Sequence, residues 1–290
     1  MISFHSILEH YGITPKSIRL VRHGDGQIPI LKTFRLHRER FDVYQKFQNS
    51  NRFGDSKHIA VFAPMPANTA LFLGLYDING CVATNKLTDE HSFLIEKFKF
   101  PKDWIQEGVF YELALNPVMD ELSERLVIDW GAPAIAYIRL GENDKDVLEI
   151  KRPNSVSDFI SYSEVKLDHY ELKKIILSPN SNLTWKNALS SVNGIYLIRD
   201  KSTGKLYVGS AYGEQGIFGR WKQYAKTGHG DNEMLKVLDH DNFEFSILEI
   251  TPLTLSTQEV VKIENKWKDR LGTWLFDNLN SMELHGALKD

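Results

Sequence analysis

The chain has 290 residues, 42% of them hydrophobic, and a formal net charge of −3, a composition typical of a globular protein with room for two domains. No apolar run approaches the roughly 18–20 residues that cross a bilayer, and residues 1–20 lack the pattern of a secretory signal peptide, so we expect no association with a membrane. Cys81 is the one cysteine, which excludes an internal disulfide and a cysteine-rich zinc site and favours a reducing compartment, the cytoplasm.

Residues 1–178 are rich in short β-prone runs and poor in helical patterns. A short amphipathic helix is expected at the N-terminus, and further helices at 40–49 and 170–177. Many short strands with few helices indicate a barrel-like or strongly bent sheet, which makes this a β-rich N-terminal domain. The strands are expected at 58–63, 70–78, 109–115, 125–130, 134–140 and 147–150.

One basic segment of this domain is a candidate for binding nucleic acid. Residues 15–46 hold eight Lys or Arg and three Asp or Glu. Phosphate contacts are expected from Lys32, Arg35, Arg38 and Arg40, although such a cluster can equally be a solvated face. Trp104, Tyr111 and Trp130 could hold a flipped base, or they could be ordinary core residues.

Turn-forming residues 178–182 (SPNSN) mark a boundary between two domains, 1–178 and 183–290. Beyond the boundary, residues 194–209 (GIYLIRDKSTGKLYVG) predict a hairpin with one tyrosine on each strand. Strand alternation places Tyr196 on the face of Ile198, and Tyr207 on the face of Gly209. A register in which paired residue numbers sum to 403 sets the two tyrosines directly opposite each other. Cross-strand packing alone would also explain such a pair.

A helix over about 217–226 follows the hairpin. It places Arg220 and Tyr224 at positions i and i+4, on one face, and Trp221 and Ala225 on a neighbouring stripe suited to packing. Residues 199–226 are a second basic cluster, with six Lys or Arg against two acids. Lys222 is therefore a candidate nucleic-acid contact.

The last predicted helix begins at Ser256, with Glu259 completing a capping box, and ends at Gly272. Its apolar stripe includes Val260 and Trp267, and Glu264 lies inside that stripe. A carboxylate on an inward face is costly unless it is paired or bound to a metal. Glu264 is therefore either a metal ligand or the partner of an arginine in a salt bridge at the edge of the stripe.

Together these motifs resemble the GIY-YIG nuclease family. The chain has GIY at 194–196, YVG at 207–209, GRW at 219–221, a tyrosine four residues after that arginine, and the helix with Glu264. The resemblance implies a C-terminal domain with a three-stranded antiparallel sheet flanked by helices, so the whole chain is expected to be α+β. A second stretch, TALFLGLYDING at 69–80, bears a faint resemblance to PUA- or EVE-like barrels that read modified bases.

The family resemblance implies a role for several residues. Tyr196 and Tyr207 match the signature tyrosines, with Tyr196 as the general base and Tyr207 positioning the water. Arg220 matches the family arginine, which would bind a non-bridging phosphate oxygen. Glu264 matches the glutamate that holds Mg²⁺ or Mn²⁺. Asn280, with Asn278 as a rival, matches the asparagine near the end of the domain, and Tyr224 stands where relatives have histidine or tyrosine. His229, in the stretch TGHGDN, is a candidate for contact with the nucleic-acid substrate.

The expected function is a metal-dependent endonuclease that hydrolyses phosphodiester bonds of double-stranded DNA. The N-terminal domain would choose the target, as in restriction or defence enzymes, including targets that carry modified bases. The alternatives are a repair or mobile-element nuclease acting on damaged or branched DNA, and a nucleic-acid-binding protein that does not cleave. One metal site cuts one strand at a time, so cleavage of both strands would require a homodimer at least on DNA.

Overall fold

The structure is a computed structural model that describes residues 2–24, 26, 28–87, 89–101, 108–132 and 137–273. Two compact units divide the chain, Met1–Lys151 and Arg152–Asp290, and each is described by itself. None of the helices among the described residues combines the length and the apolar character needed to cross a membrane.

The first unit is built on one curled, half-barrel sheet. Its strands follow the order β2-β5-β4-β3-β1-β7, and β6 pairs with β4 and β8. Register shifts at Val61/Phe62 and Ile78/Gly80 interrupt the ladders of β4, and such bulges increase the local twist of a sheet. The strands are β1 (Ile18–Arg22), β2 (Phe47–Gln48), β3 (His58–Met65), β4 (Thr69–Ala83), β5 (Val109–Asn116), β6 (Leu126–Asp129), β7 (Ile138–Leu140) and β8 (Val147–Ile150).

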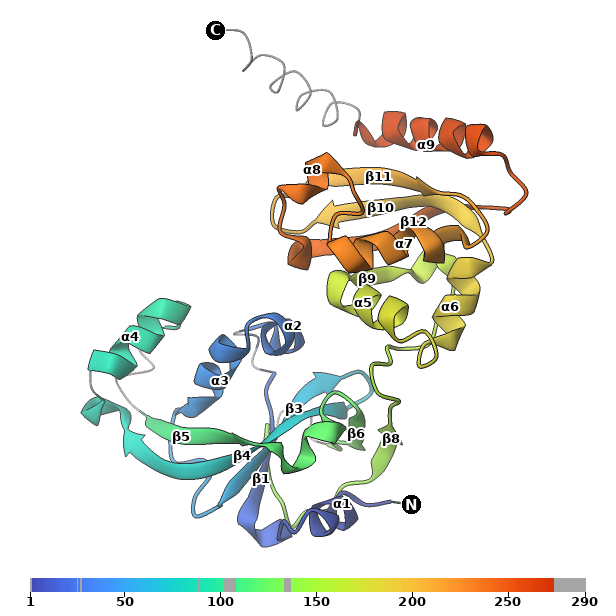
Figure 1. Cartoon of the computed structure of the whole chain (residues 1–290). Helices are drawn as coiled ribbons and strands as arrows, with labels where there is room; N and C mark the ends of the chain where they lie inside the picture. Colours follow the sequence, from blue (N-terminus) through green and yellow to red (C-terminus); the bar gives the residue numbers. More distant parts are fainter. Residues whose placement is uncertain are drawn as a thin grey trace, which may run out of the picture. The chain divides into compact units, whose positions relative to one another are not determined.

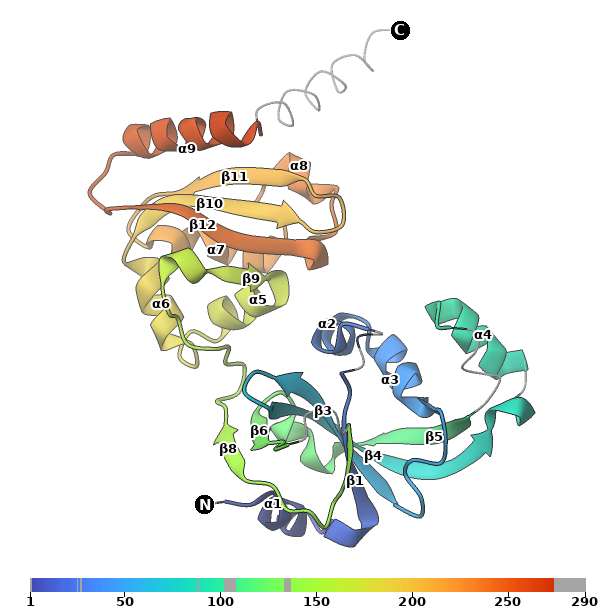
Figure 2. The ribbon, with the colours of Figure 1, turned by 180° about the vertical axis from the view of Figure 1, so that it is seen from behind.

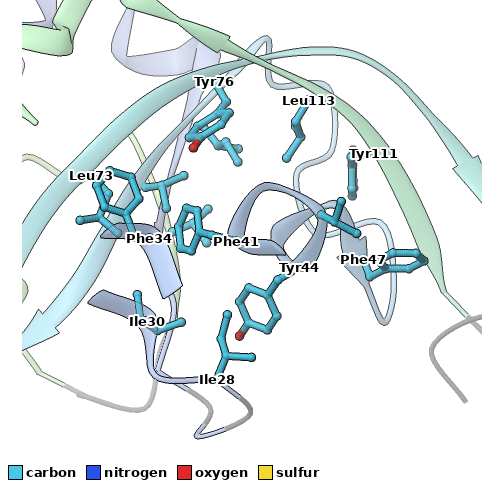
Figure 3. Close-up of a cluster of buried hydrophobic side chains, with 14 of the residues drawn as sticks. Ile28, Ile30, Phe34, Phe41, Tyr44, Phe47, Leu73, Tyr76, Tyr111 and Leu113 are labelled. Atoms are coloured by element: carbon cyan, nitrogen blue, oxygen red, sulfur yellow. The ribbon is translucent and has the colours of Figure 1, made fainter. Parts of the chain in front are cut away.

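Among its described residues this unit has four α-helices: α1 (Phe4–His10), α2 (Ile30–Leu36), α3 (Arg38–Lys46) and α4 (Asp89–Phe98). The hollow of the curled sheet holds α2 and α3, whose Phe34, Phe41 and Tyr44 pack against Tyr76 and Leu113 of the long strands (Figure 3). Aromatic side chains of the sheet and of both helices thus form a core in the hollow of the sheet.

A second core lies between the sheet and α1. Trp130 is fully buried there, with Phe4 and Phe62, and Tyr111 is 1% exposed within the first core. Both residues are therefore core residues, the ordinary alternative to a base-binding pocket. Trp104 lies outside the described residues.

Each of the six strands expected in this unit contains an observed strand, and the helices expected at the N-terminus and at 40–49 are present as α1 and α3. The sequence did not predict β1, α2 and α4. It also did not predict β2, which occupies the end of the run 40–49 that was expected to be helical. Only the end of the run 134–140 is a strand within the described residues. The barrel-like description is confirmed in a coarse form, as a half-barrel.

The second unit contains a small antiparallel sheet with the strand order β11-β10-β12-β9. The three strands expected after residue 183 are joined by a short fourth strand at the edge. The strands are β9 (Lys166–Asp168), β10 (Asn193–Asp200), β11 (Leu206–Ala211) and β12 (Phe243–Thr251).

Helices cover both faces of this sheet (Figures 1 and 2). One face packs against α5, α6 and α7, whose Leu172, Leu189 and Trp221 share a core with Phe245 of β12. The other face packs against α9, whose Val260 contacts Ile195 and Val208. The helices are α5 (His169–Leu177), α6 (Leu183–Ser190), α7 (Gly216–Thr227), α8 (Glu233–Lys236) and α9 (Thr257–Leu271).

The division between the two units lies earlier than the sequence boundary at 178. Residues 152–178 include β9, which pairs with β12, and α5, which packs against α7. Pairing and burial thus join these residues to the C-terminal unit, although the turn-forming segment at 178–182 is present.

Candidate active site

The hairpin of β10 and β11 sets the position of both signature tyrosines. Tyr196 pairs with Gly209, and Tyr207 pairs with Ile198, so paired residue numbers sum to 405 rather than to the expected 403. The tyrosines share a face as diagonal neighbours and are not directly opposite. The cause is the turn, where the Asp200 carboxylate accepts hydrogen bonds from Ser202 and Thr203 and stabilises a longer loop.

Gly209 makes room for the Tyr196 ring. A Cβ atom at position 209 would lie 2.5 Å from both Cζ and the hydroxyl oxygen of Tyr196, closer than atoms of this kind approach. Since Gly209 is the cross-strand partner of Tyr196, the phenol lies directly over the glycine backbone. The glycine of YVG is therefore needed to make room for the Tyr196 ring, and not to form the turn of the hairpin.

Arg220 binds two phenols at once. Its Nε donates to the Tyr196 hydroxyl at 3.1 Å, and its Nη2 donates to the Tyr224 hydroxyl at 3.1 Å. Its Nη1 donates to the Gly230 carbonyl at 3.2 Å and to the Gln223 side chain. Four of the five guanidinium N–H groups thus have protein acceptors, and α7 supplies Arg220 and Tyr224 at the expected spacing.

The two phenol oxygens, of Tyr196 and Tyr224, lie 2.9 Å apart, so one phenol donates its proton to the other. Burial raises the pKa of Tyr196, and the bonds from Arg220 and Tyr224 act in the opposite direction without offsetting it. Burial also raises the pKa of Tyr224, and its hydrogen bond to Tyr196 raises it further. The Arg220 guanidinium favours the Tyr196 phenolate, but burial outweighs this effect on the pKa, because Tyr196 is fully buried.

Glu264 projects from α9, whose ends match the sequence: Ser256 and Glu259 form a capping box, and Gly272 caps the C-terminus at a φ of 66°. The carboxylate accepts a hydrogen bond from the Ser210 hydroxyl and lies 2.9 Å from the Lys268 ammonium. The salt-bridge partner is therefore a lysine one turn further on, not an arginine. The Glu264 side chain is 13% exposed.

A pocket of about 500 Å³ brings these groups together, at the outer strand β11. Tyr196, Tyr207 and Arg220 line it from the α7 side of the sheet, and Ser210 and Glu264 line it from the α9 side. Residues of four elements, β10, β11, α7 and α9, thus converge at one pocket. They can meet because β11 is the edge strand of the sheet, so side chains from both faces come together at its free edge. Asn280 and Asn278 lie outside the described residues.

Sequence reasoning missed several polar groups of this pocket region, and Ser210 and Lys268 are the two that contact Glu264. Lys268 had a signal, since it lies four residues after Glu264 on the same helix. Ser210 had none, because its proximity to Glu264 depends on how α9 packs against β11.

The basic residues of α2 and α3 have protein partners. Arg35 donates to Glu124 at 3.1 Å, with both side chains largely buried, and Arg38 donates to Asp42 and to the Tyr76 hydroxyl. Arg40 lies over the Phe100 ring at 5.6 Å, and Lys32 is half-buried. Phosphate binding by these four residues stays a prediction, and for Arg35 it would require its ion pair to open.

The two candidates after the hairpin differ in setting. Lys222 is exposed on α7. His229 is half-buried in the loop that follows α7, where its Nδ1 accepts a hydrogen bond from the Asp231 backbone. This loop also supplies the Gly230 carbonyl that binds Arg220.

A buried histidine supports the backbone behind Tyr224. His169, at the start of α5, is 1% exposed, and its Nε2 lies 3.2 Å from the Tyr224 carbonyl oxygen. A carbonyl can only accept, so Nε2 is the protonated nitrogen. Burial lowers the pKa of His169 to about 4, so the ring is neutral near pH 7.

Comparison with protein families matches residues 192–277 to the GIY-YIG catalytic domain. No curated protein and no solved structure matches the chain. The match begins just before β10, runs past the end of α9, and so includes Tyr196, Tyr207, Arg220 and Glu264. The C-terminal unit of this chain therefore contains a GIY-YIG domain, the catalytic domain of a nuclease-type family.

Proposed function

We propose that this protein is an endonuclease that hydrolyses phosphodiester bonds of double-stranded DNA with the help of a divalent cation, Mg²⁺ or Mn²⁺. The observation that carries the proposal is that Tyr196, Tyr207, Arg220 and Glu264 line one pocket within a GIY-YIG domain. Nuclease-type chemistry follows from the family. The metal, the DNA substrate and the residue roles belong to the proposal.

The groups around Glu264 fit a hard cation. A carboxylate and a hydroxyl, from Glu264 and Ser210, are oxygen donors of the kind that Mg²⁺ prefers. The ammonium of Lys268 lies 2.9 Å from the carboxylate, so the position already favours positive charge. When bound, a divalent cation would neutralise phosphate charge and stabilise the leaving 3′-oxygen.

The residues of the pocket would orient the phosphate and the attacking water. The one N–H of Arg220 without a protein acceptor would donate to a non-bridging phosphate oxygen. If the Gln223 side chain moves away, an N–H of Nη1 would also be available to the phosphate. Because Arg220 also binds Tyr196 and Tyr224, the same guanidinium would fix the position of the phosphate relative to both phenols. Tyr207, half-buried beside the pocket, would hold the water.

We assign the general base to Tyr196. Its oxygen accepts from Arg220 and lies within hydrogen-bond distance of Tyr224. If Tyr224 is the donor, the Tyr196 hydroxyl can lose its own proton to solvent, and the resulting phenolate would accept a proton from the attacking water. Two donors to one phenol oxygen favour its phenolate and oppose the effect of burial. Tyr207 is the rival for this role.

The N-terminal unit would select the target, in a restriction or defence enzyme of the cytoplasm. Its curled sheet and the basic residues of α2 and α3 offer a surface that the small catalytic domain lacks. A requirement for modified bases belongs to this proposal, as does a homodimer formed on DNA to cut both strands. A role in repair or in a mobile element, on damaged or branched DNA, is the alternative for the same chemistry.

The test is cleavage of a plasmid panel, modified and unmodified, with Mg²⁺ and with EDTA, by the wild type and by Glu264→Ala. Loss of Glu264 is expected to lower the rate at least about 100-fold, since a bound cation contributes several kcal/mol to stabilising the transition state. Asp269→Ala, an exposed acid on the same helix, is the matched control and should cut at the wild-type rate.

Each result separates the candidates. Cutting that survives Glu264→Ala, or that continues in EDTA, would rule out the proposed metal site. Binding of DNA without cutting by the wild type would favour a non-cleaving protein. Preference for branched or damaged substrates over every plasmid would favour the repair function.

A further inference from the structure

Three side chains outside the pocket form a group with the composition of a metal site. His169 lies at the start of α5, and His240 and Asp241 lie in the short 3₁₀ turn before β12 (His240–Asn242). One nitrogen of each histidine and one oxygen of Asp241 lie within 4.8 Å of one another. His169 Nδ1 is 4.0 Å from Asp241 Oδ1, and His240 Nε2 is also 4.0 Å from that oxygen.

A hydrogen bond outside the group presents the His169 nitrogen as a ligand. Nε2 of His169 donates to the Tyr224 carbonyl, which leaves the lone pair on Nδ1, the nitrogen nearer to Asp241. Histidines that bind metals generally donate their other N–H to a carbonyl or a carboxylate, because that bond fixes the ring and its tautomer. The ring is 1% exposed and T-shaped against His240, with centroids 4.6 Å apart.

The backbone also makes room for the second histidine. Gly228, which ends α7 at a φ of 82°, has no side chain, and a Cβ there would lie 2.8 Å from Cγ and Nδ1 of His240. The His240 ring therefore lies over the glycine, with Nε2 as the nitrogen nearer to Asp241.

We propose that His169, His240 and Asp241 bind one transition-metal ion of the Zn²⁺ class, with a fourth position open to water. Imidazole nitrogens suit Zn²⁺, Co²⁺ or Ni²⁺ and not Mg²⁺, which prefers oxygen ligands. This site is chemically distinct from the Glu264 carboxylate and independent of it.

Only small movements are needed to close the site. Ligand atoms around a tetrahedral Zn²⁺, with bonds of about 2.0–2.1 Å, lie about 3.3 Å apart. The side chains of His240 and Asp241 are 43% and 48% exposed, so they can turn toward the fixed, buried His169. The ion would also lie near the C-terminal end of α7, where the carbonyl groups favour a cation.

The metal would brace the helix that carries the phenol–arginine cluster. It would link the start of α5 to the turn before β12. The other nitrogen of His169, Nε2, would at the same time hold the Tyr224 carbonyl of α7 in place. Its expected role is to stabilise the C-terminal unit and the position of Tyr224, and no step of cleavage passes through it.

The test uses the intact chain, freed of metal, and measures Zn²⁺ binding by competition with a chromophoric chelator. The wild type is expected to bind one equivalent. Both His240→Ala and Asp241→Asn should lower the affinity by at least about 10- to 100-fold, because loss of a residue that only supports a metal ligand already has an effect of that size. Co²⁺ should give the visible absorption bands of a four-coordinate site in the wild type, and the two variants should lose them.

Two controls separate this site from others. His37→Ala, an exposed histidine in the first unit, should bind as the wild type does. Glu264→Ala should also keep Zn²⁺ binding, so failure of the proposed nuclease site would not be mistaken for failure of this one. Zn²⁺ should raise the melting temperature of the wild type and of both controls, and not that of His240→Ala.

The side chains of His240 and Asp241 are about half exposed, so their loss is not expected to unfold the protein, and circular dichroism of the variants checks this point. Binding of Zn²⁺ by His240→Ala and Asp241→Asn with the wild-type affinity would overturn the proposal. The absence of tight binding by the wild type would overturn it equally.

Discussion

The Tyr196 ring depends on the absence of a side chain at position 209. In Gly209→Ala the new methyl would fall on the phenol, which cannot move away because it is fully buried under α7. We expect a cost of about 1–3 kcal/mol in the free energy of unfolding, typical of overpacking. Displacement of the phenol by an ångström should also lower DNA cleavage by about 100-fold. Chemical denaturation and single-turnover cleavage measure the two effects.

Gly80→Ala is the matched control for this substitution. Gly80 also lies in a strand, but a Cβ there would meet nothing closer than the Glu112 Oε2 at 3.6 Å, an ordinary contact. Stability and cleavage should stay close to those of the wild type. Equal cleavage by Gly209→Ala and Gly80→Ala would mean that the Tyr196 position is not important for the reaction.

The hydroxyl of Tyr224 should lower the pKa of Tyr196 rather than contact the substrate. In Tyr224→Phe the Tyr196 oxygen loses a donor, so its pKa, already raised by burial, rises further. A base with a higher pKa needs a higher pH to be deprotonated, so the rising limb of the pH–rate profile should move to higher pH. At neutral pH the rate should fall by about 10- to 100-fold, which corresponds to the free energy that a hydrogen bond to a charged group contributes.

The pH–rate profile of cleavage by Tyr224→Phe provides the measurement. Tyr162→Phe removes a phenol hydroxyl from the same unit, at Ala188 and Ser191, and should leave the profile in place. An unshifted profile in Tyr224→Phe would contradict the assignment of Tyr196 as the base and would favour Tyr207.

At the scale of elements, α9 carries a lysine that competes with a metal ion for the Glu264 carboxylate. Lys268 lies one helical turn after Glu264 and binds the same carboxylate, with side chains 15% and 13% exposed. A metal ion must share or displace that partner. In Lys268→Met the half-saturating Mg²⁺ concentration for cleavage should fall about two- to fivefold, the equivalent of a partly exposed ion pair. Lys266→Met, an exposed lysine on the same helix, is the control. A rise in the required Mg²⁺ would show instead that Lys268 assists binding.

The elements of the C-terminal unit could largely be read from local sequence signals. The capping box and the final glycine of α9, and the i, i+4 pair of α7, depend on residues a few positions apart, and all are confirmed. The hairpin register could not be predicted, because the Asp200 side chain decides the length of the turn. The meeting of Ser210 with Glu264 was also hidden, because it depends on packing between β11 and α9.

At the scale of the whole molecule, local patterns predicted a β-rich first unit and its helices α1 and α3, but not α2 and α4. The residues of α2 lie in a basic segment that reads as a surface, yet Phe34 and Ile30 fill the hollow of a curled sheet. The pairing of Arg35 with Glu124 explains why a positive charge can lie so close to that core. Burial of this kind depends on the curvature of β4 and β5, which no local pattern encodes.

The division between the units gives a prediction about folding. A fragment of residues 152–290 keeps β9 and α5, and a fragment of residues 183–290 lacks both. Without α5 the core of the C-terminal unit loses Leu172 and Ile175, both fully buried, and His169, which binds the Tyr224 carbonyl. Deleting such side chains lowers the free energy of unfolding by roughly 2–5 kcal/mol each. Together these losses are comparable with the whole free energy of unfolding of a small domain.

We therefore expect the fragment 152–290 to melt cooperatively and to cleave DNA without the selectivity of the intact chain. The fragment 183–290 should show no cooperative melting by circular dichroism and no cleavage. Selectivity is expected to go with residues 1–151, because the pocket lies wholly within the second unit. If the shorter fragment melts at the same temperature as the longer one, α5 is not required for folding, and the boundary at 178–182 is the real domain limit.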